Sequence, residues 1–114
     1  MHEVSIAQSV ISIVERSVPE NNIKKVTSVF LSIGRLSGIE IDALKFAFSI
    51  IKKDSLLKDA EMVIETINGK AICNDCGKSF ELSEYATPCP NCESFSLKII
   101  EGKEMNVTHI ELED

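Results

Sequence analysis

The spacing of apolar residues predicts a helix, a strand and a second helix in the first half of the chain. Over residues 4–18, apolar side chains recur every three or four positions, as on one face of a helix: Val4, Ala7, Val10 or Ile11, Val14 and Val18. Residues 24–33 have the composition of a strand, with Thr27, Val29, Leu31 and Ile33 on one face. Residues 39–53 return to helical spacing, with one stripe formed by Leu44, Ala47, Phe48 and Ile51.

The second half of the chain contains two more alternating segments. Residues 60–67 alternate around Met62 and Ile64 and predict a strand, and Asn68-Gly69 predicts a turn after it. Residues 97–112 alternate again, with an interruption at Gly102-Lys103. We expect this last segment to return to the sheet of the first strands. Residues 70–96 then form an insertion within one α/β domain.

The insertion contains all four cysteines of the chain. They form two pairs, Cys73-Asn74-Asp75-Cys76 and Cys89-Pro90-Asn91-Cys92, with twelve residues between the pairs. A CxxC turn brings two sulfurs close enough to bind one ion, and two such turns can complete a tetrahedron around Zn²⁺. A site closed by four thiolates has no open position for a substrate, so we expect the function to be carried by other residues.

Composition and charge limit the partners. The 114-residue chain has a formal net charge of −6, and its basic residues come together only in pairs such as Lys24-Lys25 and Lys52-Lys53. Such a surface is unsuited to nucleic acid. No apolar run could span a bilayer, and Glu3 does not fit a signal peptide. We therefore expect a cytoplasmic protein with no membrane partner, whose paired CxxC motifs bind metal rather than form disulfides.

The residues do not assemble a catalytic site. The cysteines are committed to metal, there are two histidines, and no phosphate-binding or dinucleotide motif is present. We therefore predict that the protein is not an enzyme. Met1, His2 and Glu3 could hold Ni²⁺ through the α-amine, backbone nitrogens and an imidazole. Taken alone, the same triplet also fits a solvated tail before a helix, and His109 fits a partly buried, hydrogen-bonded strand residue better than a ligand.

The order of these features resembles the HypA/HybF family of nickel metallochaperones for [NiFe] hydrogenase maturation. The shared features are an initiating Met-His-Glu that leads into an amphipathic helix, a strand that ends at Ile33-Gly34, the two CxxC pairs and a last strand entered at Gly102-Lys103-Glu104-Met105. The resemblance covers the whole chain. It implies that His2 is a nickel ligand rather than a solvated residue of the tail.

The resemblance implies an α+β fold with two domains. One is a small α/β nickel-binding domain with two helices and a three-stranded mixed sheet, residues 1–69 and 97–114. The other is an inserted rubredoxin-like zinc ribbon, residues 70–96. It implies structural Zn²⁺ on Cys73, Cys76, Cys89 and Cys92, and labile, transported Ni²⁺ on Met1, His2 and Glu3. This ribbon lacks the histidines that couple the two metals in some members.

The resemblance also implies protein partners: the nickel-inserting GTPase HypB and the large-subunit precursor of [NiFe] hydrogenase. The chain is expected to be a monomer or a homodimer. Two other classes share the cysteines. A zinc ribbon that binds nucleic acid or transcription proteins should present a basic, aromatic face. A rubredoxin-like electron carrier should hold iron and be red.

Overall fold

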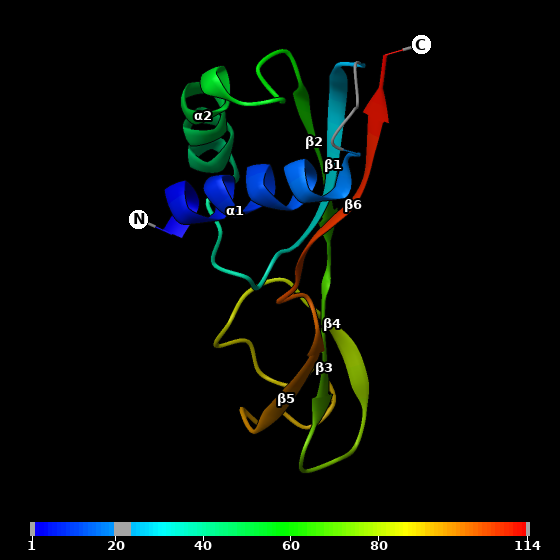
Figure 1. The fold of residues 1–114 in the computed structure, drawn as a ribbon. Helices are drawn as coiled ribbons and strands as arrows, with labels where there is room; N and C mark the ends of the chain where they lie inside the picture. Colours follow the sequence, from blue (N-terminus) through cyan, green and yellow to red (C-terminus); the bar gives the residue numbers. More distant parts are fainter. Residues whose placement is uncertain (1, 20–23, 114) are drawn as a thin grey trace. The chain divides into compact units, whose positions relative to one another are not determined.

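The computed structural model of the protein describes residues 2–19 and 24–113, without the side chain of His2. In that part of the chain the elements follow in the order shown in Figure 1: α1 (His2–Ser17), β1 (Val26–Gly34), α2 (Ile41–Ile51), the 3-10 helix η1 (Lys52–Asp54), β2 (Glu61–Ile67), β3 (Gly69–Cys73), β4 (Ser79–Leu82), β5 (Leu97–Glu101) and β6 (Met105–Leu112). The helices predicted over 4–18 and 39–53 and the strands predicted over 24–33 and 60–67 are confirmed.

The chain forms two compact units. The first consists of Met1–Leu31, Ile39–Ile64 and Val107–Asp114, and the second of Ser32–Gly38 and Glu65–Asn106. The predicted fold class is confirmed: one sheet is mixed and has the order β2-β1-β6, and the other has the order β4-β3-β5 and contains the cysteines. The domain boundaries proposed at 69/70 and 96/97 stay a prediction, because a compact unit need not fold alone.

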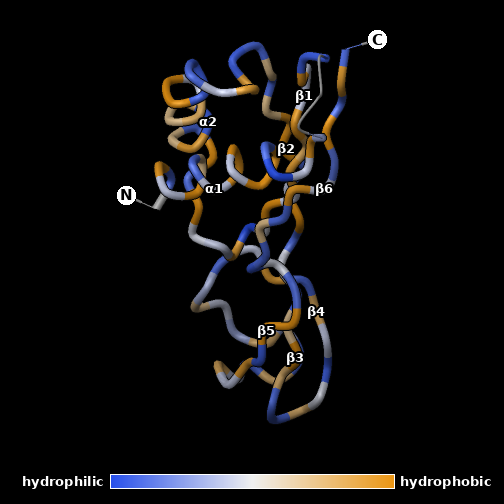
Figure 2. The backbone as a smooth tube through the Cα atoms, in the orientation of Figure 1, coloured by the Kyte–Doolittle hydropathy of each residue, from blue (hydrophilic) through white to orange (hydrophobic). Residues whose placement is uncertain are grey.

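The first unit has an aliphatic core between its helices and its sheet. The residues predicted to share one face of β1 are buried, except Thr27 at the strand's start. The helices contribute fully or nearly buried side chains that follow the predicted spacing: Ala7, Val10 and Val14 from α1, and Leu44, Ala47 and Phe48 from α2. α1 and α2 pack against each other. Figure 2 shows the alternation of polar and apolar positions along α1, in contrast to the more uniformly apolar α2.

The second unit has a much smaller core. Leu36, Ala71 and Leu82 are buried together, and three partly buried residues pack against them: Phe80, Leu97 and Ile99. Tyr85 fixes the segment that carries Leu36, because its hydroxyl donates a 2.7 Å hydrogen bond to the Leu36 carbonyl. Burial of so few apolar side chains supplies too little free energy to offset the conformational entropy that is lost when the long loops around the cysteines become ordered.

The expectation that residues 97–112 return to the first sheet is wrong for the first part of that segment. β5 pairs antiparallel with β3, with Ala71 opposite Ile99 and Cys73 opposite Leu97. Only β6 joins β1 in the first sheet. The physical reason is that Leu97 and Ile99 cover the small core of the second unit. Gly102, with φ of 107°, then separates the two strands.

Asn68-Gly69 was expected to form a turn, but only Asn68 separates β2 from β3. The Asn68 side chain accepts a 2.7 Å hydrogen bond from Arg35 Nε. Gly69 is needed for close packing instead, because a Cβ at this position would collide with the carbonyl oxygen of Leu82. Gly34 has the same role, since a Cβ there would collide with the carbonyl of Gly102.

We predict that Gly34→Ala lowers the free energy of unfolding by about 3 kcal/mol, because the carbonyl it would strike is backbone and cannot swing away. Gly38→Ala is the control. It meets nothing within 4 Å and should cost only about 1 kcal/mol for its φ of 79°. Urea unfolding followed by circular dichroism measures both, and equal losses would contradict the close-packing role of Gly34.

Candidate functional site

The four cysteines lie together at one end of the second sheet. Cys73 is the last residue of β3 and is buried, as is Cys89, whereas Cys76 and Cys92 are exposed. The sulfur of Cys73 lies 3.5 Å from that of Cys92, and the sulfur of Cys76 lies 3.7 Å from that of Cys89. All four sulfurs lie within 4.8 Å of one another. The structure thus brings together the four residues that the spacing singled out.

The two CxxC turns have the same backbone geometry. In the first, Gly77 N–H donates to the Cys73 carbonyl and Cys73 N–H donates to the Lys78 carbonyl, both at 2.9 Å. In the second, Glu93 and Ser94 occupy the equivalent positions, with both distances 2.8 Å. The residue after the second cysteine has positive φ in both turns, 78° at Gly77 and 64° at Glu93. Glycine adopts that conformation without strain, whereas glutamate does not.

Side chains next to the cysteines connect the two turns. The Ser94 hydroxyl donates to the Asp75 carboxylate, and Asn74 Nδ2 donates to Ser96 Oγ at 3.2 Å. Asn74 N–H also donates to the Ser96 carbonyl at 2.9 Å. These contacts join the two turns and hold them in register.

The sulfur geometry fits a tetrahedral metal ion. A Zn–S bond of ~2.3 Å gives an edge of ~3.8 Å between sulfurs of a regular tetrahedron. The separations of 3.5 and 3.7 Å are close to that edge. Four soft thiolates select ions such as Zn²⁺ or iron over hard cations such as Mg²⁺ or Ca²⁺. The cluster is therefore a metal site suited to a soft ion.

Hydrogen bonds stabilise some of these sulfurs as thiolates. A backbone hydrogen bond from Lys78 and a side-chain hydrogen bond from Asn91 lower the pKa of Cys76 to about 6. A backbone hydrogen bond from Cys76 lowers the pKa of Cys73. At Cys92 a backbone hydrogen bond from Ser94 also favours the thiolate, but a side-chain hydrogen bond with Cys73, desolvation by burial and hydrogen bonds with the other two sulfurs raise the pKa to about 12. Hydrogen bonds among the sulfurs and their desolvation thus limit how many thiolates form without a cation.

The N-terminal triplet is described only in part. Met1 and the side chain of His2 lie outside the described residues, so their expected role stays a prediction. Glu3 is half-buried in the first turn of α1, and its Oε2 accepts a 3.1 Å hydrogen bond from Glu40 N–H. Glu40 in turn caps α2, where its Oε1 accepts a 3.2 Å hydrogen bond from Asp42 N–H. Glu3 therefore connects the starts of the two helices.

His109 is exposed on β6, so the expectation of partial burial is wrong for it. Its ring stacks on Phe30, with centroids 4.0 Å apart and planes 12° apart. Its Nδ1 lies 3.2 Å from the hydroxyl of Thr108, so the expected hydrogen bonding is present. Both contacts are those of a strand residue on a sheet surface.

Sequence reasoning missed several residues that organise these sites. Asn91 belongs to one CxxC pair but stabilises a sulfur of the other. In the sequence, this role could have been suspected only from the position of Asn91 inside the CxxC motif. The contact between Glu3 and Glu40 joins residues 37 apart and has no periodic signal in the sequence.

Comparisons with known proteins agree with this arrangement. A family model described as hydrogenase/urease nickel incorporation, metallochaperone HypA, matches residues 1–112. The hydrogenase maturation factor HypA of Aquifex aeolicus is 42% identical over 99% of this chain and 98% of its own. That of Geobacter metallireducens is 41% identical over 99% and 100%. The solution structure of the nickel metallochaperone HypA from Helicobacter pylori has a TM-score of 0.67 and 28% identity, and covers 96% of each chain.

These matches define a nickel metallochaperone with a four-cysteine metal site. The chain belongs to the HypA family, whose members serve hydrogenase maturation. The predicted family and function are confirmed, and with them the prediction that the protein is not an enzyme. The nucleic-acid and electron-carrier alternatives are set aside. In the described part of the chain, no helix is long and apolar enough to cross a membrane.

We predict that Asn91→Ala makes the four-cysteine site lose its metal at a higher pH than in the wild type. Removal of the hydrogen bond raises the lowered pKa of Cys76, so protons compete with the metal earlier as the pH falls. Asn106→Ala is the control, because Asn106 is exposed on β6 and lies outside the cysteine cluster. Release to a chromogenic chelator during an acid titration measures the midpoints, and the same midpoint for Asn91→Ala and the wild type would contradict this role.

Proposed function

We propose that the protein carries labile Ni²⁺ at Met1, His2 and Glu3, while a structural Zn²⁺ on Cys73, Cys76, Cys89 and Cys92 holds the ribbon together. The observation that carries this division is the closed cluster of four sulfurs within 4.8 Å of one another. Such a site has no vacant position for an ion in transit and binds too tightly to release one readily. The cargo of a nickel metallochaperone therefore needs another site.

The start of α1 suits that cargo. The helix begins at His2, and the first four N–H groups of a helix have no acceptor within it. Ni²⁺ favours planar nitrogen ligands and can displace amide protons. It could therefore take backbone nitrogens there without breaking a helical hydrogen bond. The positive end of the helix dipole opposes a cation, and the carboxylate of Glu3 offsets this in part. The opposing effects of the helix dipole and the Glu3 carboxylate favour reversible binding of Ni²⁺ at this site.

The partners proposed for this activity are proteins. They are the nickel-inserting GTPase HypB and the large-subunit precursor of [NiFe] hydrogenase, met in the cytoplasm. The net charge of −6 supports protein partners and opposes nucleic acid. Within the two-domain scheme, residues 1–69 and 97–114 hold nickel and contact the partners, and residues 70–96 form the zinc ribbon.

We predict that Cys76→Ser loses the zinc and unfolds the ribbon, while the helices of the first unit stay folded. The small core of the second unit cannot replace the free energy that the metal supplies. Metal content by mass spectrometry and hydrogen exchange by segment measure the two effects. One zinc per chain in the wild type is expected. Iron with a visible charge-transfer band, or full zinc retention in Cys76→Ser, would refute the zinc assignment.

We predict that His2→Ala abolishes specific nickel binding and leaves the zinc and the fold unchanged, because the imidazole is lost and the cluster is untouched. Glu3→Gln should have a milder effect, since an amide oxygen can still accept from Glu40 N–H. An N-terminal extension should act in part like His2→Ala, because it turns the α-amine into an amide. Calorimetric titration of untagged protein with Ni²⁺ is the measurement.

His109→Ala is the control for the nickel titration, because His109 is the other histidine of the chain and its ring contacts are with Phe30 and Thr108. It should keep wild-type affinity. Wild-type affinity in His2→Ala, with loss in His109→Ala, would move the nickel site to the sheet. In the wild type, nickel affinity should fall as the pH is lowered, because protons compete for the imidazole, the amine and the amides.

A further inference from the structure

The fold brings together basic residues that are separate pairs in the sequence. Lys24-Lys25 comes directly before β1, Lys53 lies in η1 after α2, and Lys58 follows in the loop before β2. Figure 1 shows the start of β1 and the loop from α2 to β2 at the same end of the first sheet. A hollow of about 390 Å³ lies there, and it is lined by these four lysines, two aspartates, Ser55 and Leu56.

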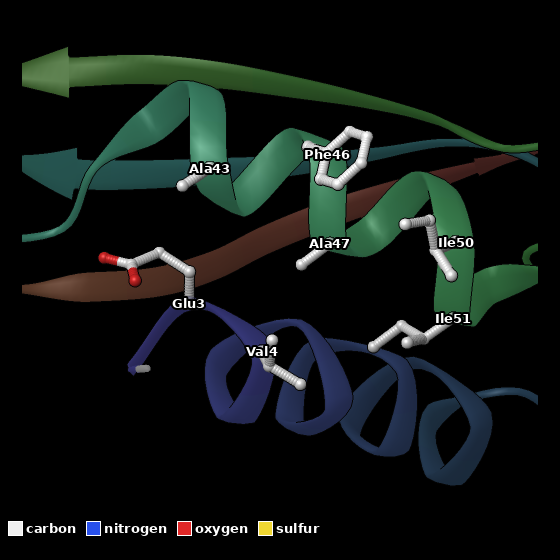
Figure 3. A pocket seen from close by; sticks show the side chains of 7 residues that line it. All are labelled: Glu3, Val4, Ala43, Phe46, Ala47, Ile50 and Ile51. Atoms are coloured by element: carbon white, nitrogen blue, oxygen red, sulfur yellow. The ribbon is translucent and has the colours of Figure 1, made fainter.

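We propose that this hollow receives an extended acidic segment of a partner protein, with an apolar residue among its carboxylates. The proposal goes beyond nickel binding and does not need it, because the two sites lie at opposite ends of α2. Figure 3 shows Glu3 at the end of α2 that carries Ala43, away from Ile51. The hollow begins after Ile51, and the 11 residues of α2 span ~16 Å. A segment held in the hollow therefore does not cover the start of α1.

Charge selects the class of partner. The chain has a net charge of −6, but the lining of the hollow has four lysines against two aspartates. Lys25 is paired with Asp59 at 3.5 Å, and both side chains are more than half exposed, so the pair contributes little to stability. Lys53 and Lys58 are exposed and make no ion pair with another described residue. Lysines gathered in this way repel one another, and carboxylates of a bound segment would offset that repulsion.

An apolar residue lies among the lysines. Leu56 lines the hollow and is 49% exposed, whereas the next residue, Leu57, is fully buried and anchors the loop. Leu56 N–H donates to Glu15 Oε2 at 3.3 Å, which fixes its backbone against α1. Burial of the Leu56 side chain under a partner would add a favourable contribution that salt does not screen. This is the reason for an apolar residue in the proposed segment.

The loop that carries these residues is held by its own hydrogen bonds. Ser55 Oγ donates to the Lys52 carbonyl at 2.8 Å and accepts from Leu57 N–H at 3.0 Å. Lys52 Nζ donates to the Ala60 carbonyl at 2.8 Å, so this lysine closes the loop instead of lining the hollow. Binding of a segment therefore loses little free energy to ordering of the loop.

The two aspartates favour carboxylates over phosphate as the ligand. A phosphate group carries up to two charges at one point and is bound by donors that converge on it. Asp54 and Asp59 stand among the lysines and would repel such a group. An acidic segment carries single charges at intervals, so its carboxylates can meet the lysines and avoid the aspartates. Nucleic acid needs a longer basic surface than one hollow on a chain with a net charge of −6.

The test uses full-length, zinc-loaded protein and a fluorescein-labelled peptide of glutamates around one leucine, with binding measured by fluorescence anisotropy. The double variant Lys53→Glu with Lys58→Glu reverses charge at the hollow, and Leu56→Ser removes the apolar contact. The control is the double variant Lys45→Glu with Lys98→Glu. It changes the net charge by the same amount, and both lysines are exposed and lie outside the hollow. Circular dichroism, zinc content and Ni²⁺ titration are recorded for every variant.

We expect the wild type to bind the peptide more weakly as ionic strength rises. At physiological ionic strength, the double variant at the hollow should weaken binding at least tenfold and Leu56→Ser about threefold, with the control within about twofold of the wild type. In amide NMR spectra of the wild type, the peptide should shift the signals of Ser55, Leu56 and Lys58. Nickel and zinc binding should be unchanged throughout.

Three outcomes would overturn the inference and leave the nickel site intact. The first is a wild type that does not bind the peptide at low ionic strength. The second is an equal loss in the two double variants, which would show an effect of net charge alone. The third is displacement of the peptide by an equal concentration of inorganic phosphate, or tighter binding of a single-stranded oligonucleotide, which would assign the hollow to a phosphate ligand.

Discussion

The packing of four sulfurs into one small volume, where they do not all ionise without a cation, is the constraint on which the ribbon depends. The sulfurs lie within 4.8 Å of one another, and the pKa of Cys92 rises to about 12 while that of Cys76 falls to about 6. A divalent cation allows all four sulfurs to bind as thiolates and fixes the two CxxC turns at once. The small core around Leu36, Ala71 and Leu82 can then be adequate, because it need not hold the loops alone.

The proposed permanent metal and the proposed transient one differ in how each would be enclosed. The cysteine cluster takes ligands from two loops with matched backbone geometry, so release requires both loops to open. The proposed nickel ligands come from consecutive residues at the start of one helix. Glu3 connects the first turn of that helix to the cap of α2 through Glu40. A single link of this kind can set the geometry of the site without closing it.

Most of the fold and half of the site follow from the sequence, for physical reasons. Periodic burial specified both helices and the strands of the first sheet, and the CxxC spacing specified the sulfur cluster, because both patterns are local. The destination of residues 97–101 could not be predicted from alternation, since an alternating strand fits either sheet. These residues join the second sheet because their apolar side chains bury Leu36 and Ala71 there. The same holds for Glu3 with Glu40 and for Asn91 with Cys76, which join parts of the chain that no local pattern relates.

The order of strands in the first sheet has a consequence for how the protein is made. β1 is central, but its second neighbour, β6, is encoded at the far end of the chain, after the cysteine segment. As the chain leaves the ribosome, α1, β1, α2 and β2 can assemble early, while one edge of β1 remains unpaired. All four cysteines emerge before the strand that closes that edge. The cysteines are therefore available to a metal before the sheet is complete, and until β6 pairs, the open edge of β1 is exposed to aggregation.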